Sequence, residues 1–468
     1  MQLKRSSIGA ALGALTANLL AATAAHAQTA DTSVYQPDVN NDASDSDASG
    51  GGTDIGSGLA RIDSAILFYQ ENGGRVRAVE PTSNVTLNAS DGRVVSFRFT
   101  ADTLTGATPN GAMPWNQNQT FTTPAHAPGT TTTVTSASGK AQLVTIPGTG
   151  TVVRQYTVPA NQLPLDAFKD QRYAYDLGYS APFGDGGRYS IGGSYSTEHD
   201  YTSYSVNGGV SQDFNHHNTT LSLALNYEAD QSSPIFGTPS PLTQMSGDTK
   251  GPSRSKTVVN VVLGLTQAIS RHWLTELNYS YGETSGYQTD PYRVISLVDG
   301  TTGAPVEYLY ESRPSSRTRQ SVFWDNRLAL LSTFADISLR SYSDSWGIKS
   351  LTAEISDRIP LFGHFYIQPG VRYYHQTAAD FYRHYLVSGN ALPTYASSDG
   401  RLSNFNAQTN SLQLGLDFGH SEIYMRFENY SQHGQTHPAG APGALAGENL
   451  SDAVSANSVM IGFSFAFR

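Results

Sequence analysis

The sequence predicts an all-β fold, a transmembrane antiparallel up-and-down β-barrel of about 16 strands, with a range of roughly 14–18. Three observations predict it. From Arg61 to the C-terminus, apolar and polar residues alternate with a period of two, and helical spacing is nowhere sustained. The connections between the alternating runs are short at one end and long at the other. The last run carries an aromatic stripe on one face.

The composition suits a wall that is apolar on one side and wet on the other. The 468 residues include 44 Gly, 26 Tyr and 19 Phe, yet hydrophobic residues make up only 38%. The chain has no Cys, which excludes a disulfide framework and a thiolate metal site. The net charge of −10 argues against nucleic acid as a partner.

The N-terminus predicts export. Lys4 and Arg5 precede an apolar run over residues 8–25, and Ala25-His26-Ala27 has the small-x-small form of a cleavage site. We therefore predict a signal peptide over residues 1–27 and a mature chain that begins at Gln28. A membrane anchor helix is the alternative, but the run is short and rich in Ala and Thr.

Residues 28–59 form a polar segment with many Asp, Ser and Gly residues, for which we predict disorder. The alternative is a cation-binding loop, because Asp and Asn oxygens suit Ca²⁺. The spacing does not match a calcium-binding loop, and no Glu closes it. The predicted barrel domain covers residues 60–468.

The strands can be read from the alternation. The first three are expected at 61–72, 75–88 and 93–104, a further pair lies around 319–343, and the tail from Asp452 is the last. The clearest runs place Tyr173, Tyr175, Leu177 and Tyr179 on one face, and likewise Leu221, Leu223, Leu225 and Tyr227. The pairs Gly192-Gly193 and Gly208-Gly209 lie within strands, where Gly marks a bend or a crowded lumen rather than a phosphate loop.

The connections sort by length. Short turns are expected at 183–187, 215–218, 270–272, 360–364 and 419–421. Long polar loops are expected at 105–170, 231–254, 285–318, 378–398 and 432–451. A barrel with short periplasmic turns and long extracellular loops has this pattern, whereas a soluble β-sandwich has no reason to sort its loops.

The C-terminal strand is the most specific feature. One face carries Val459, Ile461, Phe463, Phe465 and Phe467. The stripe resembles the terminal signal by which outer-membrane barrels reach the barrel assembly machinery, although here the last aromatic residue is penultimate. A soluble protein that exposed such a stripe would be prone to aggregate.

Several phrases go beyond a generic barrel pattern. Among them are Arg313-Pro314, Asp344-Ser345-Trp346-Gly347-Ile348, Val371-Arg372-Tyr373-Tyr374-His375-Gln376 and Ala379-Asp380-Phe381-Tyr382. From about Ile62 onward the chain resembles domain-of-unknown-function family thirty-five seventy, a group of predicted proteobacterial outer-membrane proteins. The resemblance implies an outer-membrane barrel and carries over no catalytic residue.

Charged residues that alternate with the apolar stripes should face the lumen, because Arg at mid-depth on the lipid face costs about 2–4 kcal/mol. The candidate lumen charges are Glu276, Arg319, Asp325, Arg327, Arg340, Glu354, Arg372, Asp417, Arg426 and Glu428. Such a set forms either a polar constriction that selects solutes or a plug of paired charges that holds a narrow barrel together.

No motif indicates an enzyme, a cofactor or a metal. His216-His217, His433 and His437 lack further ligands at helpful spacing and are expected at the surface. A barrel hydrolase would need Ser and His close together on the outer wall, and no motif fixes such a pair.

Two functions remain open. One is a pore or transporter for small solutes, supported by the polar inner face. The other is a non-conducting scaffold that binds a partner protein through its lumen or long loops. Either version would lie in outer-membrane lipid of a Gram-negative bacterium.

Overall fold

The computed structural model describes residues 60–124, 135–136, 139–140, 142–145, 152–235, 237–247, 251–451 and 453–467. The predicted signal peptide (1–27) and acidic segment (28–59) lie outside the described residues.

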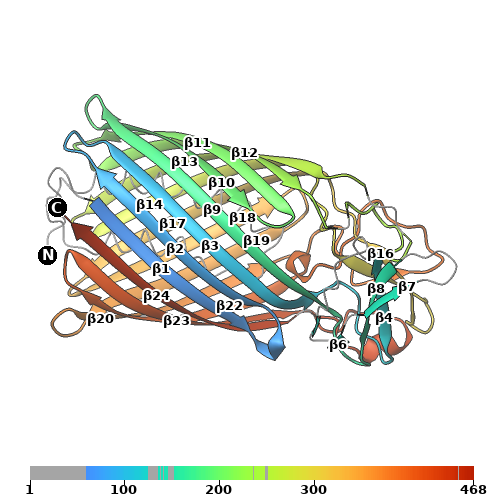
Figure 1. Cartoon of the computed structure of the whole chain (residues 1–468). Coiled ribbons are helices and arrows are strands. Elements are labelled where there is room, and N and C mark those ends of the chain that lie inside the picture. Colours follow the sequence, from blue (N-terminus) through green and yellow to red (C-terminus); the bar gives the residue numbers. More distant parts are fainter. Residues whose placement is uncertain are drawn as a thin grey trace.

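Sixteen antiparallel strands close into one barrel, which confirms the predicted fold class and strand number (Figure 1). Neighbouring strands in the wall follow chain order, apart from the short strands that belong to the loops. The wall consists of β1 (Ala60–Glu71), β2 (Arg77–Asn88), β3 (Val94–Pro109), β9 (Leu165–Phe183), β10 (Gly187–Thr197), β11 (Tyr201–Phe214), β12 (Thr219–Ser232), β13 (Arg254–Ser270), β14 (Trp273–Gly286), β17 (Ser316–Leu330), β18 (Thr333–Asp344), β19 (Lys349–Pro360), β20 (Phe365–Gln376), β22 (Phe405–Asp417), β23 (Ser421–Gly434) and β24 (Val454–Phe467).

The connections sort as the sequence predicts. All five predicted short turns lie at one end of the barrel, and the strands around the other end are joined by the five long loops and three short links. At the turn between β11 and β12, Asn215, His216 and His217 all have positive φ, a backbone conformation that Asn and His tolerate better than most residues.

The barrel closes by pairing of its first and last strands. β1 pairs with β24 from Ala60↔Phe467 to Glu71↔Ala456, and β24 also pairs with β23. The tail is therefore the closing strand, as predicted. The wall therefore has no edge strand. A membrane protein needs such closure, because lipid offers no hydrogen-bond partner to unpaired backbone groups.

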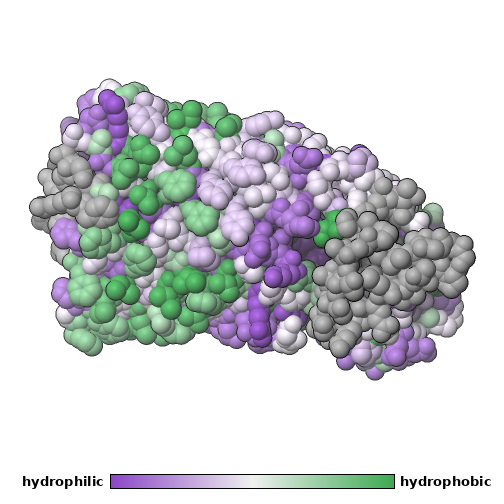
Figure 2. Space-filling view, in the orientation of Figure 1, coloured by the Kyte–Doolittle hydropathy of each residue, from purple (hydrophilic) through white to green (hydrophobic). Residues whose placement is uncertain are grey.

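The outer face carries an apolar belt. Leu177, Ile191 and Val206 are 60%, 61% and 61% exposed. In Figure 2 hydrophobic residues gather over the part of the barrel nearer the short turns, and hydrophilic ones over the strand ends toward the long loops. Ile461, Phe463 and Phe465 of the closing strand belong to this belt. Among the described residues, no helix is long and apolar enough to span a membrane.

The long loops are folded rather than merely polar. They contain the sheets β16 (Pro305–Tyr310)–β15 (Val294–Val298)–β21 (Leu386–Val387) and β4 (Gln119–Pro124)–β8 (Val152–Val158)–β7 (Gln142–Thr145), and the pair β5 (Thr135–Ser136)–β6 (Gly139–Lys140). Short 3₁₀ turns are η1 (Asn72–Gly74), η2 (Gly400–Leu402) and η3 (Gly443–Gly447). We call the long-loop assembly the cap; it lies beyond one end of the barrel (Figure 1).

The cap has its own hydrophobic cores. One joins Phe121 and Tyr156 to Met245 and to Val294 and Tyr310, and so unites three loops. A second joins Met113 and Trp115 to Val298, Leu445 and Leu450. These loops are mostly polar, and the few apolar residues that form the cores lie far apart in the sequence. The sequence alone therefore does not predict that they pack together.

Candidate functional site

All ten candidate lumen charges face the barrel interior. Each lies on the face opposite the exposed apolar residues of its strand: Arg426 and Glu428, for example, alternate with exposed Ile423, Met425 and Phe427. Their orientation follows from the period of two and the closure of the wall. Whether they select a solute stays a prediction.

The structure brings several of the ten together in pairs. Arg426 Nε lies 3.0 Å from Glu428 Oε1, and Arg327 Nε lies 3.4 Å from Asp325 Oδ2. Glu354 and Arg372 are direct cross-strand partners between β19 and β20. These pairs favour a wall of compensated charges over a ring of one sign.

Asp417 belongs to a cluster that the sequence reading missed. Arg358 donates to Asp417 at 2.9 Å and also pairs with Glu422 at 3.2 Å. The guanidinium lies 3.6 Å from the centre of the Tyr366 ring, and the Tyr366 hydroxyl donates to Glu422. The cluster lies near the short turns, since Asp417 ends β22.

The remaining candidates have separate surroundings. Glu276 accepts a hydrogen bond from Asn278, Arg319 donates to Thr284 at 3.1 Å, and Arg340 lies over the Phe323 ring at 5.0 Å. Arg319 is near the cap end of its strand, whereas Asp417 is at the opposite end of the barrel. The ten therefore line the height of the wall and do not converge on one constriction.

A further inward cluster lies on β2, β3 and β9. Arg172 Nε is 2.6 Å from Asp102 Oδ2, and its Nη2 is 3.9 Å from Glu80 Oε2. The same alternation that placed the other charges could have found this group, because all three residues alternate with outward-facing neighbours.

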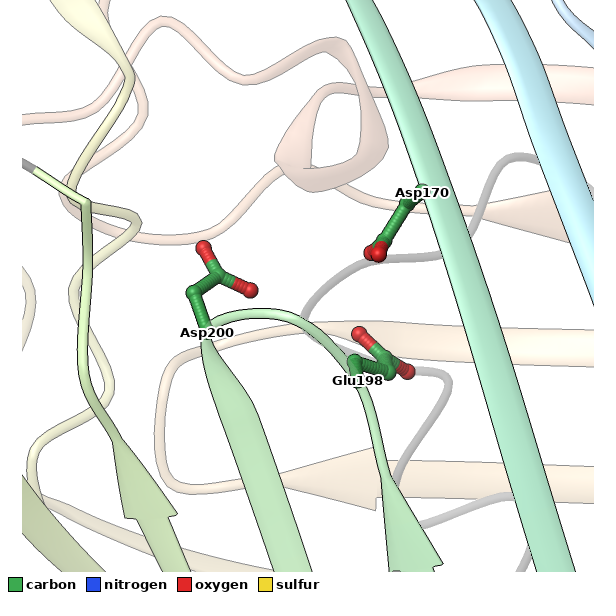
Figure 3. Close-up of side chains that lie close together, drawn as sticks. All are labelled: Asp170, Glu198 and Asp200. Carbon is green, nitrogen blue, oxygen red and sulfur yellow. The ribbon is translucent and has the colours of Figure 1, made fainter. Parts of the chain in front are cut away.

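Three carboxylates gather at the barrel rim beside the cap: Asp170, Glu198 and Asp200. Figure 3 shows Asp170 on β9 opposite Glu198 and Asp200, which lie in the turn between β10 and β11. Their oxygens lie within 4.8 Å of one another, the one such potential metal-binding group among the described residues. Ca²⁺ takes roughly 6–8 oxygen ligands, so three carboxylates alone supply only part of a site.

Two of the rim carboxylates, Glu198 and Asp200, have raised pKa values. Burial raises the pKa of Glu198 to about 8, and the neighbouring Asp170 carboxylate adds to this rise. Burial also raises the pKa of Asp200, although the hydrogen bond from the Tyr292 hydroxyl acts in the opposite direction. Sequence spacing could not reveal this cluster, because it depends on the register of β9 against β10.

A buried ion-pair network ties two cap loops together. Asp399 lies 2.9 Å from Arg313, 2.6 Å from Arg401 and 3.3 Å from Arg293. Burial opposes the charge of Asp399, but the three arginines hold its pKa well below the usual value. Arg313 also pairs with buried Glu311 at 2.6 Å. The network thus joins the loop that carries Arg313 to the loop that carries Asp399.

The comparisons with known proteins identify a family. The sequence profile of the family described as "Protein of unknown function (DUF3570)" matches residues 18–467. No curated protein matches the chain.

Solved structures resemble this chain only distantly. A mutant ferric enterobactin receptor from Pseudomonas aeruginosa has 8% identity and a TM-score of 0.40, with 85% of this chain and 58% of the receptor covered. The siderophore receptor PirA from Acinetobacter baumannii has 9% identity and a TM-score of 0.38, with 88% and 60% covered. A bacterial polysaccharide outer membrane secretin has 7% identity and a TM-score of 0.40, with 88% and 99% covered. The chain thus spans less than two thirds of these receptors.

Proposed function

Because the chain belongs to the DUF3570 family of proteins of unknown function, we propose its function from its geometry: a pore or transporter for small polar solutes. The observation that carries the proposal is the polar inner wall, on which acidic and basic side chains are paired along the height of the barrel. Such a wall accommodates water and polar solutes, and its charges bias which of them pass.

The proposed location is the outer membrane of a bacterium. A closed barrel satisfies every backbone group of its wall internally, and the apolar belt supplies the lipid-facing surface. The expected cleavage before Gln28 is the corresponding export step.

The cap would restrict the passage of solutes through this pore. Its loops pack through shared cores and through the Asp399 network. Removing one partner of a buried ion pair is strongly destabilising, because the other charges stay buried without compensation. Asp399→Asn should therefore loosen the cap while leaving the transmembrane wall intact.

The test is single-channel recording in planar bilayers. We expect small conductance steps from the native protein and larger or more frequent steps from Asp399→Asn. Asp299→Asn is the matched control, because Asp299 accepts hydrogen bonds from Thr301 and Thr302 within a single cap turn and lies outside that network. An unheated sample that migrates faster than a boiled one verifies the fold of each variant.

A scaffold that binds a partner protein is the second candidate. The observation in its favour is the exposure of apolar side chains on the folded cap, where Val306, Leu392 and Tyr395 are 59%, 48% and 41% exposed. Folded protein that gives no conductance steps, either native or as Asp399→Asn, would reject the pore and favour this alternative.

A further inference from the structure

Six polar residues form one patch on the inner wall, which we call the inner polar patch. Its members come from three adjacent strands: Ser203 and Ser205 of β11, Asn226, Glu228 and Asp230 of β12, and Asn260 of β13. They are in register, with Ser205 opposite Glu228, Ser203 opposite Asp230 and Asn226 opposite Asn260. All face inward, and Asn226 and Glu228 are only 2% and 1% exposed.

The patch concentrates buried polar atoms that the protein itself leaves unbonded. Eight side-chain atoms have no hydrogen-bond partner among the residues that the structure describes: Ser203 Oγ, Ser205 Oγ, Asn226 Oδ1 and Nδ2, both carboxylate oxygens of Glu228, Asp230 Oδ1 and Asn260 Nδ2. Buried polar groups are nearly always bonded, because an unmet bond costs free energy. So many in one place indicate a polar partner from outside the chain.

Cations of the chain lie close to both carboxylates of the patch. The other oxygen of Asp230 accepts from the Tyr201 hydroxyl at 2.6 Å and lies 3.5 Å from Lys256 Nζ. Lys256 and Arg319 are the cations that act on Glu228. A cationic ligand would therefore compete with Lys256 and Arg319 for the same carboxylates.

The unbonded atoms include both hydrogen-bond donors and hydrogen-bond acceptors. The carboxylate oxygens and Asn226 Oδ1 accept hydrogen bonds, the two Asn amide nitrogens donate, and the two Ser hydroxyls can do either. A bare metal ion would contact only the oxygens and leave the amide nitrogens unbonded. Hydroxyl groups donate and accept at once, so a molecule with several of them can match the whole set.

We propose that the inner polar patch binds a neutral, hydroxyl-rich small molecule of the polyol or sugar class. The inference rests on the proposed pore function and names its solute class. Glu228 and Asn226 are the specificity-determining residues, because they contribute four of the eight atoms. A solute without hydroxyl groups would leave those atoms unbonded and bind weakly.

The test is isothermal titration calorimetry on the full-length protein in detergent, with glucose and sorbitol as probes and CaCl₂ and glycine as comparison ligands. We expect the hydroxylated probes to bind and the comparison ligands not to bind. Glu228→Gln and Asn226→Leu should each weaken binding at least about tenfold. The first replaces an accepting oxygen by a donating amide nitrogen, and the second removes both polar atoms of the amide from a buried site. Ser205→Ala serves as a milder variant should Asn226→Leu fail to assemble.

The control variant is Glu276→Gln. Glu276 is another inward carboxylate, but its side chain accepts from Asn278 and lies outside the patch. It should bind the probes with native affinity. Three results would overturn the inference. The first is that the protein binds CaCl₂ or glycine in place of the sugars, the second is that Glu276→Gln weakens binding as much as the patch variants do, and the third is that a folded and conducting barrel binds no probe. That last result leaves the pore function standing, whereas sugar binding by a barrel that never conducts supports the site and rejects the pore.

Discussion

At the residue scale, two tyrosines of the inner wall pack directly over glycines. Tyr366 lies over its cross-strand partner Gly415, and Tyr424 lies over Gly462. A Cβ atom added at Gly462 would lie 2.3 Å from the Tyr424 ring, a separation at which one of the two must move. These glycines are needed for close approach rather than for an unusual backbone angle.

Gly462→Ala should therefore destabilise the barrel. Overpacking in a filled site typically costs about 1–3 kcal/mol. We expect a lower melting temperature of the heat-modifiable band and less assembled protein in membranes. Gly208→Ala is the control, because a Cβ atom added at Gly208 would lie an ordinary 3.6 Å from the backbone oxygen of Ser190. Equal loss in the two variants would argue against the close contact as the cause.

The sequence could predict which way residues face but not which residues meet. A period of two assigns each side chain to one face, so the inward direction of Arg372 or Glu428 followed from local spacing alone. The Asp399 network and the inner polar patch required register between strands or the packing of loops far apart in the chain. Alternation predicts neither the register between strands nor the packing between loops. The cap cores around Phe121 and Trp115 depend on loop packing, so the sequence did not predict them.

At the element scale, closure of the barrel depends on the last strand, β24. It supplies one wall position and the partner of β1, and its outward face presents Ile461, Phe463 and Phe465 to lipid. Burying each such side chain in lipid contributes about 1.5–3 kcal/mol. Without this strand, β1 and β23 would each present unpaired backbone groups to hydrocarbon.

Deletion of residues 460–468 should abolish assembly. We expect no heat-modifiable barrel in the outer-membrane fraction and degradation by periplasmic proteases. The length-matched control is deletion of residues 38–46 in the predicted disordered segment, which should be tolerated. Normal amounts of folded barrel after the C-terminal deletion would show that a strand other than β24 can close the wall.

At the scale of the whole molecule, the two ends of the barrel should face different compartments. The cap is expected outside the cell and the short turns in the periplasm. A protease site inserted after Gly440 in the cap should be cut on intact cells, whereas the same site after Gly419 in a short turn should be cut only after lysis. Both glycines have positive φ and open space around them, so the insertions are matched. The reverse result would invert the topology.

The second cap core joins parts of the chain that are remote in sequence. Met113 and Trp115 come from the first long loop, whereas Leu445 and Leu450 come from the last, immediately before β24. The two loops are brought together only when the wall has wrapped fully round and β24 has docked on β1. The second cap core is therefore complete only in a barrel whose first and last strands have paired.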